Sequence, residues 1–201
     1  MSDTSPRRPP ADITPTELFE TWLPGEIARL RTATSAPTPP DLRTRITVAG
    51  TEGGTWLYES KGGVLSVSRS EAAADLAVSI SGDDLRAMLD PASGILPETP
   101  NGGGGVNPLI AGPLVEQAKT IRGTFTFELT GFQGRDLAVA VTFGDAADPA
   151  AVISIDAETY AAMRDGSLPP AQAYFAGKIN VGGDAAFALQ VGMGLMAAAV
   201  S

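Results

Sequence analysis

The sequence contains no cysteine and no histidine in its 201 residues. Without a thiol or an imidazole it cannot form a Ser-His-Asp or Cys-His arrangement, a thiol redox centre, or a zinc site with nitrogen and sulfur ligands. Carboxylates alone could still hold a metal, but Asp145, Asp148 and Asp156 lack the alternate-residue spacing and final Glu of a calcium loop. The composition therefore predicts a protein that is not an enzyme and needs no cofactor.

Positive charge is also scarce. The chain has 14 Lys and Arg against 23 Asp and Glu, which gives a formal net charge of −9. Nucleic-acid binding depends on clustered basic side chains that replace the counterions of phosphates. No basic run here is longer than Arg7-Arg8. These observations exclude nucleic acid as an expected partner, and they disfavour an anionic membrane surface.

Long apolar runs are missing as well. The longest, Ala185 to Val200, contains Gln190 and is shorter than the roughly 20 residues of a membrane helix. Residues 1–11 are polar and proline-rich, without the apolar stretch of a signal peptide. Hydrophobic residues make up 43% of the chain, which is enough for a core. We expect a soluble, cytoplasmic protein without a transmembrane segment, and the abundance of Ala, Gly and Pro indicates a GC-rich bacterial genome.

The first regular element is a helix with a clear start. Thr14, Pro15 and Glu17 match a capping box with proline at the first helical position. Pro24-Gly25 predicts a break or kink before a second helical segment with Ile27 and Leu30. One apolar stripe at helical spacing is expected to face the core: Leu18, Phe19, Trp22 and Leu23.

From Arg43 the apolar period changes from helical to two, which predicts strands. Gly50 to Gly54 supplies a hairpin turn, and Gly62-Gly63 a second turn. Asp75 to Ser81 is a further expected strand, and Ser81 to Asp84 open a short helix with Leu85, Met88 and Leu89 on one side.

A stretch rich in proline and glycine, Pro91 to Pro108, follows this first set of elements. Its glycine run, Gly102 to Gly105, has neither the Lys of a P-loop nor the preceding strand of a dinucleotide site, so we interpret it as a flexible linker. Beyond it the pattern predicts these elements: a helix at Leu109–Ile121, strands at Thr124–Leu129, Leu137–Phe143 and Val152–Ile155, a helix capped by Asp156, a helix at Ala171–Ala176, a strand at Lys178–Val181, and a final segment from Ala185.

An internal repeat organises the chain. Val48 to Tyr58 pairs with Leu129 to Val139, and Leu76 to Met88 pairs with Ala151 to Met163. Each copy is expected to contain a helix, a hairpin, a strand and a short helix. The predicted organisation is a disordered N-terminus (1–13), a first, truncated repeat (14–90), the linker (91–108) and a second, more complete repeat (109–201).

A longer motif lies in the second repeat. Gly166, Leu168, Pro169 or Pro170, Tyr174-Phe175, Gly177-Lys178, Ile179, Val181, Gly183 and Asp184 follow one another without gaps. This run resembles the C-terminal half of a sterol carrier protein 2 domain, and Ile46 to Leu89 resembles the first part of one. The first repeat lacks the F-x-G-K element, and the second lacks the strand supplied by Val64 to Ser68. Each half is therefore expected to complete the other in one sheet. The family's peroxisomal C-terminal tripeptide is absent.

The resemblance implies an α+β fold with a mixed or antiparallel sheet, helices packed on one face, and a duplicated or double-length version of the domain. Between the layers the family keeps a hydrophobic tunnel for sterols or acyl chains. Tyr174 and Phe175 are expected to be core residues beside it, and ordinary core packing is the alternative for Tyr160 and Met163. Met163, Met193, Leu195 and Met196 lie in the blocks that line the tunnel in such domains, and the last segment is more apolar than covering a small sheet requires. The residues expected to contact the ligand are Tyr160, Met163, Tyr174, Phe175, Ile179, Phe187, Leu189, Met193, Leu195 and Met196.

Three functions follow from this reading. The first is non-catalytic binding of an apolar ligand (a fatty acyl chain, a sterol or a similar lipid) for carriage or presentation. The alternative is a scaffold that has filled its tunnel and binds another protein. An enzyme would have to rely on carboxylates, tyrosine or lysine. The sequence leaves open the ligand, the protein partner and the oligomeric state.

Overall fold

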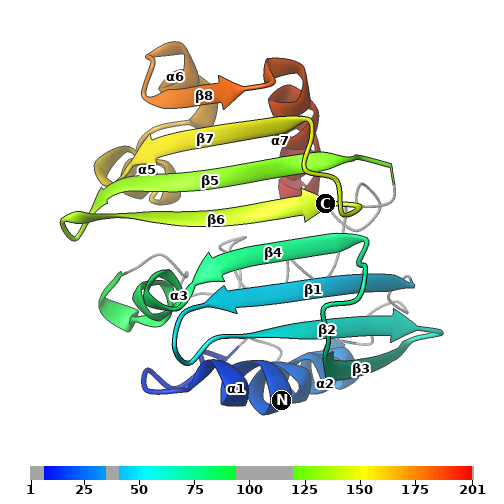
Figure 1. The fold of residues 1–201 in the computed structure, drawn as a ribbon. Helices are drawn as coiled ribbons and strands as arrows, with labels where there is room; N and C mark the ends of the chain where they lie inside the picture. The colour runs from blue at the N-terminus through cyan, green and yellow to red at the C-terminus, as the bar shows by residue number, and fades with distance from the viewer. Residues whose placement is uncertain (1–6, 35–40, 94–119, 201) are drawn as a thin grey trace.

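The computed structural model describes residues 7–34, 41–93 and 120–200, without the side chains of residues 33–34 and 193–200. Eight strands are present in this part of the chain, and they form one sheet (Figure 1). Their spatial order is β3-β2-β1-β4-β6-β5-β7-β8. The strands are β1 (Leu42–Ala49), β2 (Gly54–Lys61), β3 (Val64–Arg69), β4 (Leu76–Ser81), β5 (Gly123–Phe132), β6 (Arg135–Phe143), β7 (Ala150–Asp156) and β8 (Ile179–Gly183).

The helical elements lie between these strands and at both ends of the described chain. They are α1 (Pro15–Glu17), η1 (Leu18–Trp22), α2 (Leu23–Thr34), α3 (Gly82–Leu89), η2 (Pro91–Ser93), α5 (Ala157–Arg164), α6 (Pro170–Phe175) and α7 (Ala185–Val200). The sequence predicted nearly all of them. The expected linker at 91–108 and helix at Leu109–Ile121 lie mostly outside the described residues.

The first helix begins as its sequence predicts, but it does not end at Pro24-Gly25. The Thr14 side chain accepts the Glu17 N–H, and the Glu17 carboxylate accepts the Thr14 N–H, so the capping box is complete. Before Pro24 the helix widens into a π-turn, in which the Leu23 N–H donates to the Leu18 carbonyl. Proline has no N–H to donate, and this turn lets the helix continue past it.

All the helices that pack on the described sheet cover the same face. The buried positions of β1 alternate, with Ile46 buried and its neighbours half-exposed. Ile46 lies opposite Trp56 on β2 and beside Val78 on β4, which lies opposite Val141 on β6. Val141 in turn lies opposite Phe125 on β5. The three hydrophobic clusters share this face, which confirms the predicted α+β class with helices on one side.

Strand connectivity repeats between the two halves of the sheet. In the N-terminal half, β1 pairs antiparallel with β2 and parallel with β4, and α3 follows β4. In the C-terminal half, β5 pairs antiparallel with β6 and parallel with β7, and α5 follows β7. This topology matches the two repeats proposed from the sequence. A duplication as the origin of the repeats stays a prediction.

The halves meet where β4 pairs antiparallel with β6, from Leu76–Phe143 to Ile80–Val139. We call this pairing the seam. It falls where the first repeat lacks its last strand and the second lacks its third strand. Two strands that would otherwise be edges therefore pair with each other, and their backbone groups are satisfied. One double-length sheet results, as the sequence predicted.

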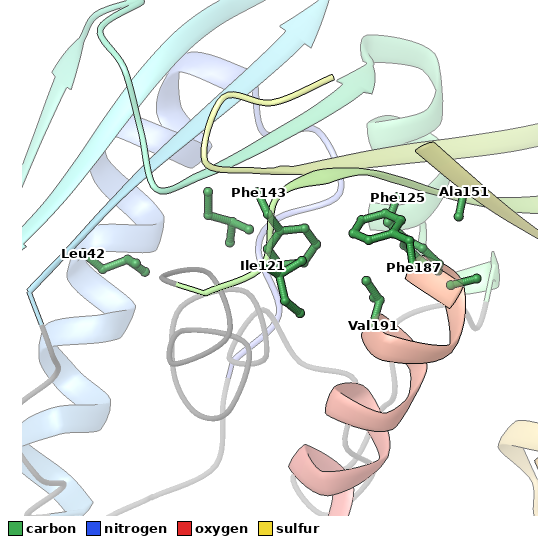
Figure 2. Packing of buried hydrophobic residues seen from close by; sticks show 9 residues of the cluster. Leu42, Ile121, Phe125, Phe143, Ala151, Phe187 and Val191 are labelled. Atoms are coloured by element: carbon green, nitrogen blue, oxygen red, sulfur yellow. The ribbon is translucent and has the colours of Figure 1, made fainter. Parts of the chain in front are cut away.

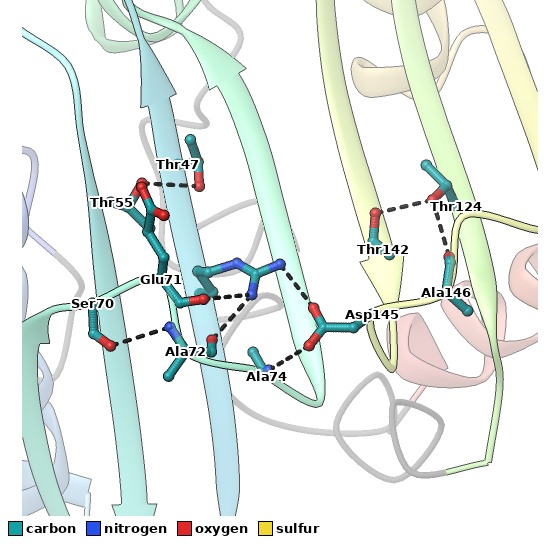
Figure 3. A network of polar contacts seen from close by, with 11 residues as sticks. Thr47, Thr55, Ser70, Glu71, Ala72, Ala74, Thr124, Thr142, Asp145 and Ala146 are labelled. Carbon is teal, nitrogen blue, oxygen red and sulfur yellow. Dashed lines mark hydrogen bonds and ion pairs between the residues drawn. The ribbon is translucent and has the colours of Figure 1, made fainter.

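An ion pair between the halves closes each end of the seam. At one end, Arg45 donates to Asp145 at 2.7 Å, and Asp145 also accepts the Ala74 N–H at 3.0 Å (Figure 3). At the other end, Asp84 at the start of α3 accepts from Arg135 on β6. The side chain of Asp84 is 12% exposed and that of Arg135 39% exposed, so this pair is partly desolvated.

The partly buried pair yields a stability prediction. Arg135→Ala leaves the Asp84 carboxylate buried without its cationic partner, and we expect a loss of about 1–2 kcal/mol of unfolding free energy. Arg86→Ala is the matched control, because its ion pairs with Asp83 and Glu52 are exposed and should be worth less than about 0.5 kcal/mol. Urea denaturation measures both variants, and equal losses would contradict this role for the seam.

A second prediction concerns pH. The buried Tyr58 hydroxyl donates to the Phe19 carbonyl beneath the first helix. Burial raises the Tyr58 pKa well above the ordinary tyrosine value of 10.0, and the nearby Glu20 adds to the effect. The folded state therefore holds the phenol proton more tightly than the unfolded state. Its contribution to stability is complete below about pH 10 and is lost as pH rises further.

The measurement is the unfolding free energy of the wild type and Tyr58→Phe at about pH 8 and about pH 11. Tyr58→Phe has no phenol to titrate, so its stability should fall less over this interval. An identical alkaline loss in both proteins would show that the Tyr58 proton does not contribute.

Candidate functional site

Helix α5 lies at one end of the helix-covered face in the C-terminal half. Asp156 caps it, accepting the Thr159 N–H and the Thr159 hydroxyl, each at 2.7 Å. These hydrogen bonds lower the Asp156 pKa. The cap fixes the start of the helix, so that Tyr160 packs beside Phe127 of β5 with 6.2 Å between ring centroids. Burial raises the Tyr160 pKa, although nearby Arg164 opposes the shift.

The turn from β8 into α7 lies at the other end of this face and positions helix α7. Gly183 has a φ of 78°, and a Cβ there would lie 2.3 Å from the Ala150 carbonyl oxygen, so only glycine fits. The next residue, Asp184, donates its N–H to that same oxygen at 2.8 Å. Its carboxylate accepts the Phe187 N–H at 2.9 Å and caps the helix. Gly183 and Asp184 of the sequence motif therefore direct the start of α7 toward the sheet.

Phe187 and Val191, one turn apart on α7, are buried against the sheet (Figure 2). They pack in one cluster with Phe125 of β5 and Phe143 of β6. Phe143 is 1% exposed, so the sheet is well covered here. Leu189 lies between the two buried positions in sequence, and its side chain is exposed.

The middle of the face differs from both ends. Phe127, Val141 and Ile153 are only half-buried, and they pack against the α7 cluster. Phe127 also contacts the cluster that contains Tyr160, so the strip connects the two ends. The register places the three side chains on the same face of β5, β6 and β7. We call Phe127, Val141 and Ile153 the apolar strip, and it is the candidate ligand surface.

Most of the ligand residues expected from the sequence occupy this half, in different environments. Tyr160 and Met163 on α5 and Ile179 on β8 are half-buried, and Phe187 is fully buried. Tyr174 and Phe175 on α6 are exposed, so the expectation that they are core residues is wrong. Leu189 is exposed too. The side chains of Met193, Leu195 and Met196 lie outside the described part of the chain.

The exposure of Tyr174 and Phe175 has a simple cause. Helix α6 has only six residues, and Ala173 is the one that it buries. The next two positions turn away from that contact, because successive helical residues are about 100° apart. The sequence could identify the helix, but it could not show that its small residue faces inward.

Sequence reasoning did not assign the apolar strip. Its residues alternate with Thr126, Thr142 and Ser154 within strands that were expected. This alternation gives a face, but the strip exists only because β5 lies between β6 and β7 in the sheet. The sequence predicted where the strands lie along the chain, but it did not predict their order in the sheet, on which the strip depends.

A surface depression of about 630 Å³ lies elsewhere, in the N-terminal half. It lies between the β1–β2 turn and the start of α3, and Glu52, Asp83 and Arg86 line it. Arg86 pairs with both acids. This polar, ion-paired surface does not suit an apolar ligand.

Comparison with protein families finds a match in the C-terminal half. Residues 113–195 match the SCP-2 sterol transfer family. The resemblance predicted from the sequence is therefore confirmed over this region, which holds the apolar strip and the α5 and β8–α7 ends of the site. The similarity of Ile46 to Leu89 to the same family lies outside the matched residues and stays a prediction.

Other comparisons give no relative. Neither the curated proteins nor the solved structures include a match to this chain. The SCP-2 match covers less than half of the sequence, and the seam joins it to the N-terminal half.

The difference between the ends and the middle of the face is testable. Phe143→Ala empties a fully buried position, and we expect a loss of about 3–5 kcal/mol of unfolding free energy. Phe127→Ala removes the same side chain from a half-buried position in the SCP-2 region. Phe127→Ala should lower the unfolding free energy by about half as much as Phe143→Ala, because it removes less buried apolar area and leaves a smaller cavity. Denaturant unfolding compares them, and equal costs would show that the strip is packed as tightly as the ends.

Proposed function

We propose that this protein binds an apolar ligand, such as a fatty acyl chain, a sterol or a similar lipid, along the apolar strip of its C-terminal half. The match of residues 113–195 to the SCP-2 sterol transfer family carries the proposal. The half-buried Phe127, Val141 and Ile153 support it, because they offer apolar area on the helix-covered face. Binding for carriage or presentation requires no reaction and no cofactor.

The energetics suit a carrier. A sixteen-carbon chain withdrawn from water gains on the order of 10 kcal/mol, at about 0.8 kcal/mol per methylene. Loss of motion on binding offsets part of this gain and leaves an affinity in roughly the micromolar range. Such an affinity allows both capture and release.

Tyr160 supplies a polar group at one end of the strip. Burial raises its pKa, so the phenol remains protonated at neutral pH. A neutral hydroxyl can donate a hydrogen bond to the carboxylate or hydroxyl group of a lipid without placing another charge beside it. We propose that the polar end of the ligand lies at the α5 end of the strip, beside Tyr160, while Phe127 contacts the apolar part.

Native mass spectrometry with organic extraction tests the proposal. The freshly purified wild type should carry, or take up, a fatty acid or sterol-like molecule. Ile153→Trp should lose most of this ligand, because the larger ring occupies the strip. Val152→Trp is the matched control: Val152 is also half-buried and lies next in the chain, but it faces the other side of the sheet.

A fluorescent fatty acid gives the affinities. We expect binding to weaken at least about tenfold in Ile153→Trp and to change little in Val152→Trp, since only the first side chain enters the proposed site. Circular dichroism establishes that both variants are folded. Unchanged binding by a folded Ile153→Trp would remove the strip from the site.

One observation favours a second candidate function, a protein-binding scaffold. Under α7 the space against the sheet is filled by Phe125, Phe143, Phe187 and Val191. A domain whose tunnel is filled by its own side chains would keep the fold and bind a protein instead. An unliganded wild type that also ignores added lipids would favour this scaffold over the carrier.

A further inference from the structure

An exposed aromatic pair lies beside the site without belonging to the core. Phe175 is 86% exposed and Tyr174 57% exposed, and the two rings pack edge to face with 5.8 Å between centroids. Their direction is fixed by the fold: Ala173 is buried, and Gly177, with a φ of 69°, ends the segment. Two large aromatic side chains exposed side by side form a hydrophobic patch, and such patches indicate an interaction surface.

We propose that Tyr174 and Phe175 form the contact with a lipid bilayer from which the protein takes its ligand. This inference rests on the proposed carrier function. Helix α6 lies beyond β8 at one edge of the sheet (Figure 1), and it connects α5 to β8. Tyr160 of α5 belongs to the candidate site. A bilayer touching α6 would therefore lie next to α5, which borders the strip.

The chemistry of the pair favours a membrane interface. Tyrosine and other amphipathic aromatic side chains concentrate at the level of lipid headgroups, where the ring is in apolar surroundings and the hydroxyl is hydrated. Phenylalanine adds apolar area to the same contact. Two shallowly inserted rings give weak, reversible attachment, which a carrier needs in order to leave with its ligand.

The exposed area argues against a protein partner at this surface. At roughly 200 Å² for each aromatic side chain, the exposed fractions of Tyr174 and Phe175 offer on the order of 300 Å². A stable protein interface needs about 800 Å² from each partner. A second copy of this chain would have to draw more than half of its contact area from the surface around the pair, whereas a bilayer needs no matching partner surface.

The charge of the protein determines which kind of bilayer we expect it to bind. The charged residues nearest the pair in sequence are Arg164 and Asp165 before it and Lys178 after it, so both signs are present. The whole chain carries a formal charge of −9, which opposes an anionic surface. The expected surface is therefore zwitterionic, and phosphatidylcholine vesicles are the appropriate probe.

The experiment is co-sedimentation with phosphatidylcholine vesicles. The double variant Tyr174→Ser/Phe175→Ser should bind at least about fivefold more weakly than the wild type, because it loses the inserted apolar area. Val64→Ser is the matched control, since Val64 is 70% exposed on β3, at the opposite edge of the sheet. Its vesicle binding should remain that of the wild type.

A second readout separates this inference from the proposed function. Fluorescent fatty acid added without vesicles should bind the double variant and the wild type equally, whereas transfer of the fatty acid out of vesicles should slow in the double variant alone. If the wild type does not bind the free fatty acid, the carrier function is wrong. The proposed membrane contact, which rests on that function, is then wrong as well.

Three results would overturn the membrane contact while leaving the carrier function in place. The first is equal vesicle binding by the double variant and the wild type, or none by either. The second is loss of free fatty acid binding in a folded double variant, which would make the pair a ligand contact. The third is a wild-type dimer that dissociates in the double variant, which would make the pair a self-association surface.

Discussion

The pairing of β4 with β6 is the constraint on which the rest of the structure depends. Each half of the sheet lacks a strand at the side where it meets the other, and two unpaired strand edges would be left there. Their antiparallel pairing, from Leu76–Phe143 to Ile80–Val139, satisfies those backbone groups. The ion pairs Arg45–Asp145 and Asp84–Arg135 then fix the two ends. Strands β5 to β8 lie within the residues that match the SCP-2 sterol transfer family, and they are therefore one half of a sheet that continues into the N-terminal half.

The same seam explains the position of the candidate site. It places β6 inside the sheet, with β5 beyond it, so that Phe127 and Val141 lie away from either sheet edge. Helix α7 covers one end of this face, and α5 borders the other. The strip between them is apolar but only half-buried. An apolar surface held between two well-packed ends gives a long hydrophobic ligand a place without requiring any charged group.

Local signals in the sequence were reliable because local physics produces them. The capping box at Thr14, the Ser81 cap of α3, the Asp156 cap of α5, the glycine turns and the period-two strands all depend on residues close together in the chain. The sequence was less decisive where one local signal allows more than one backbone or packing outcome. Pro24-Gly25 predicted a break or a kink, and the helix continues past it through a π-turn. Tyr174 and Phe175 were expected in the core because of their residue types, yet the burial of Ala173 turns them outward.

The sequence by itself determined the helices, the strands, the absence of histidine and cysteine chemistry, and the resemblance that the match of residues 113–195 confirms. Periodicity, caps and turns are local, and a long ungapped motif identifies a family without coordinates. Only the tertiary structure decided the order of the strands, the seam, and which side chains meet. The apolar strip draws its three residues from β5, β6 and β7, and the aromatic pair projects from α6. Such groupings depend on long-range pairing, which leaves no signature within a single segment.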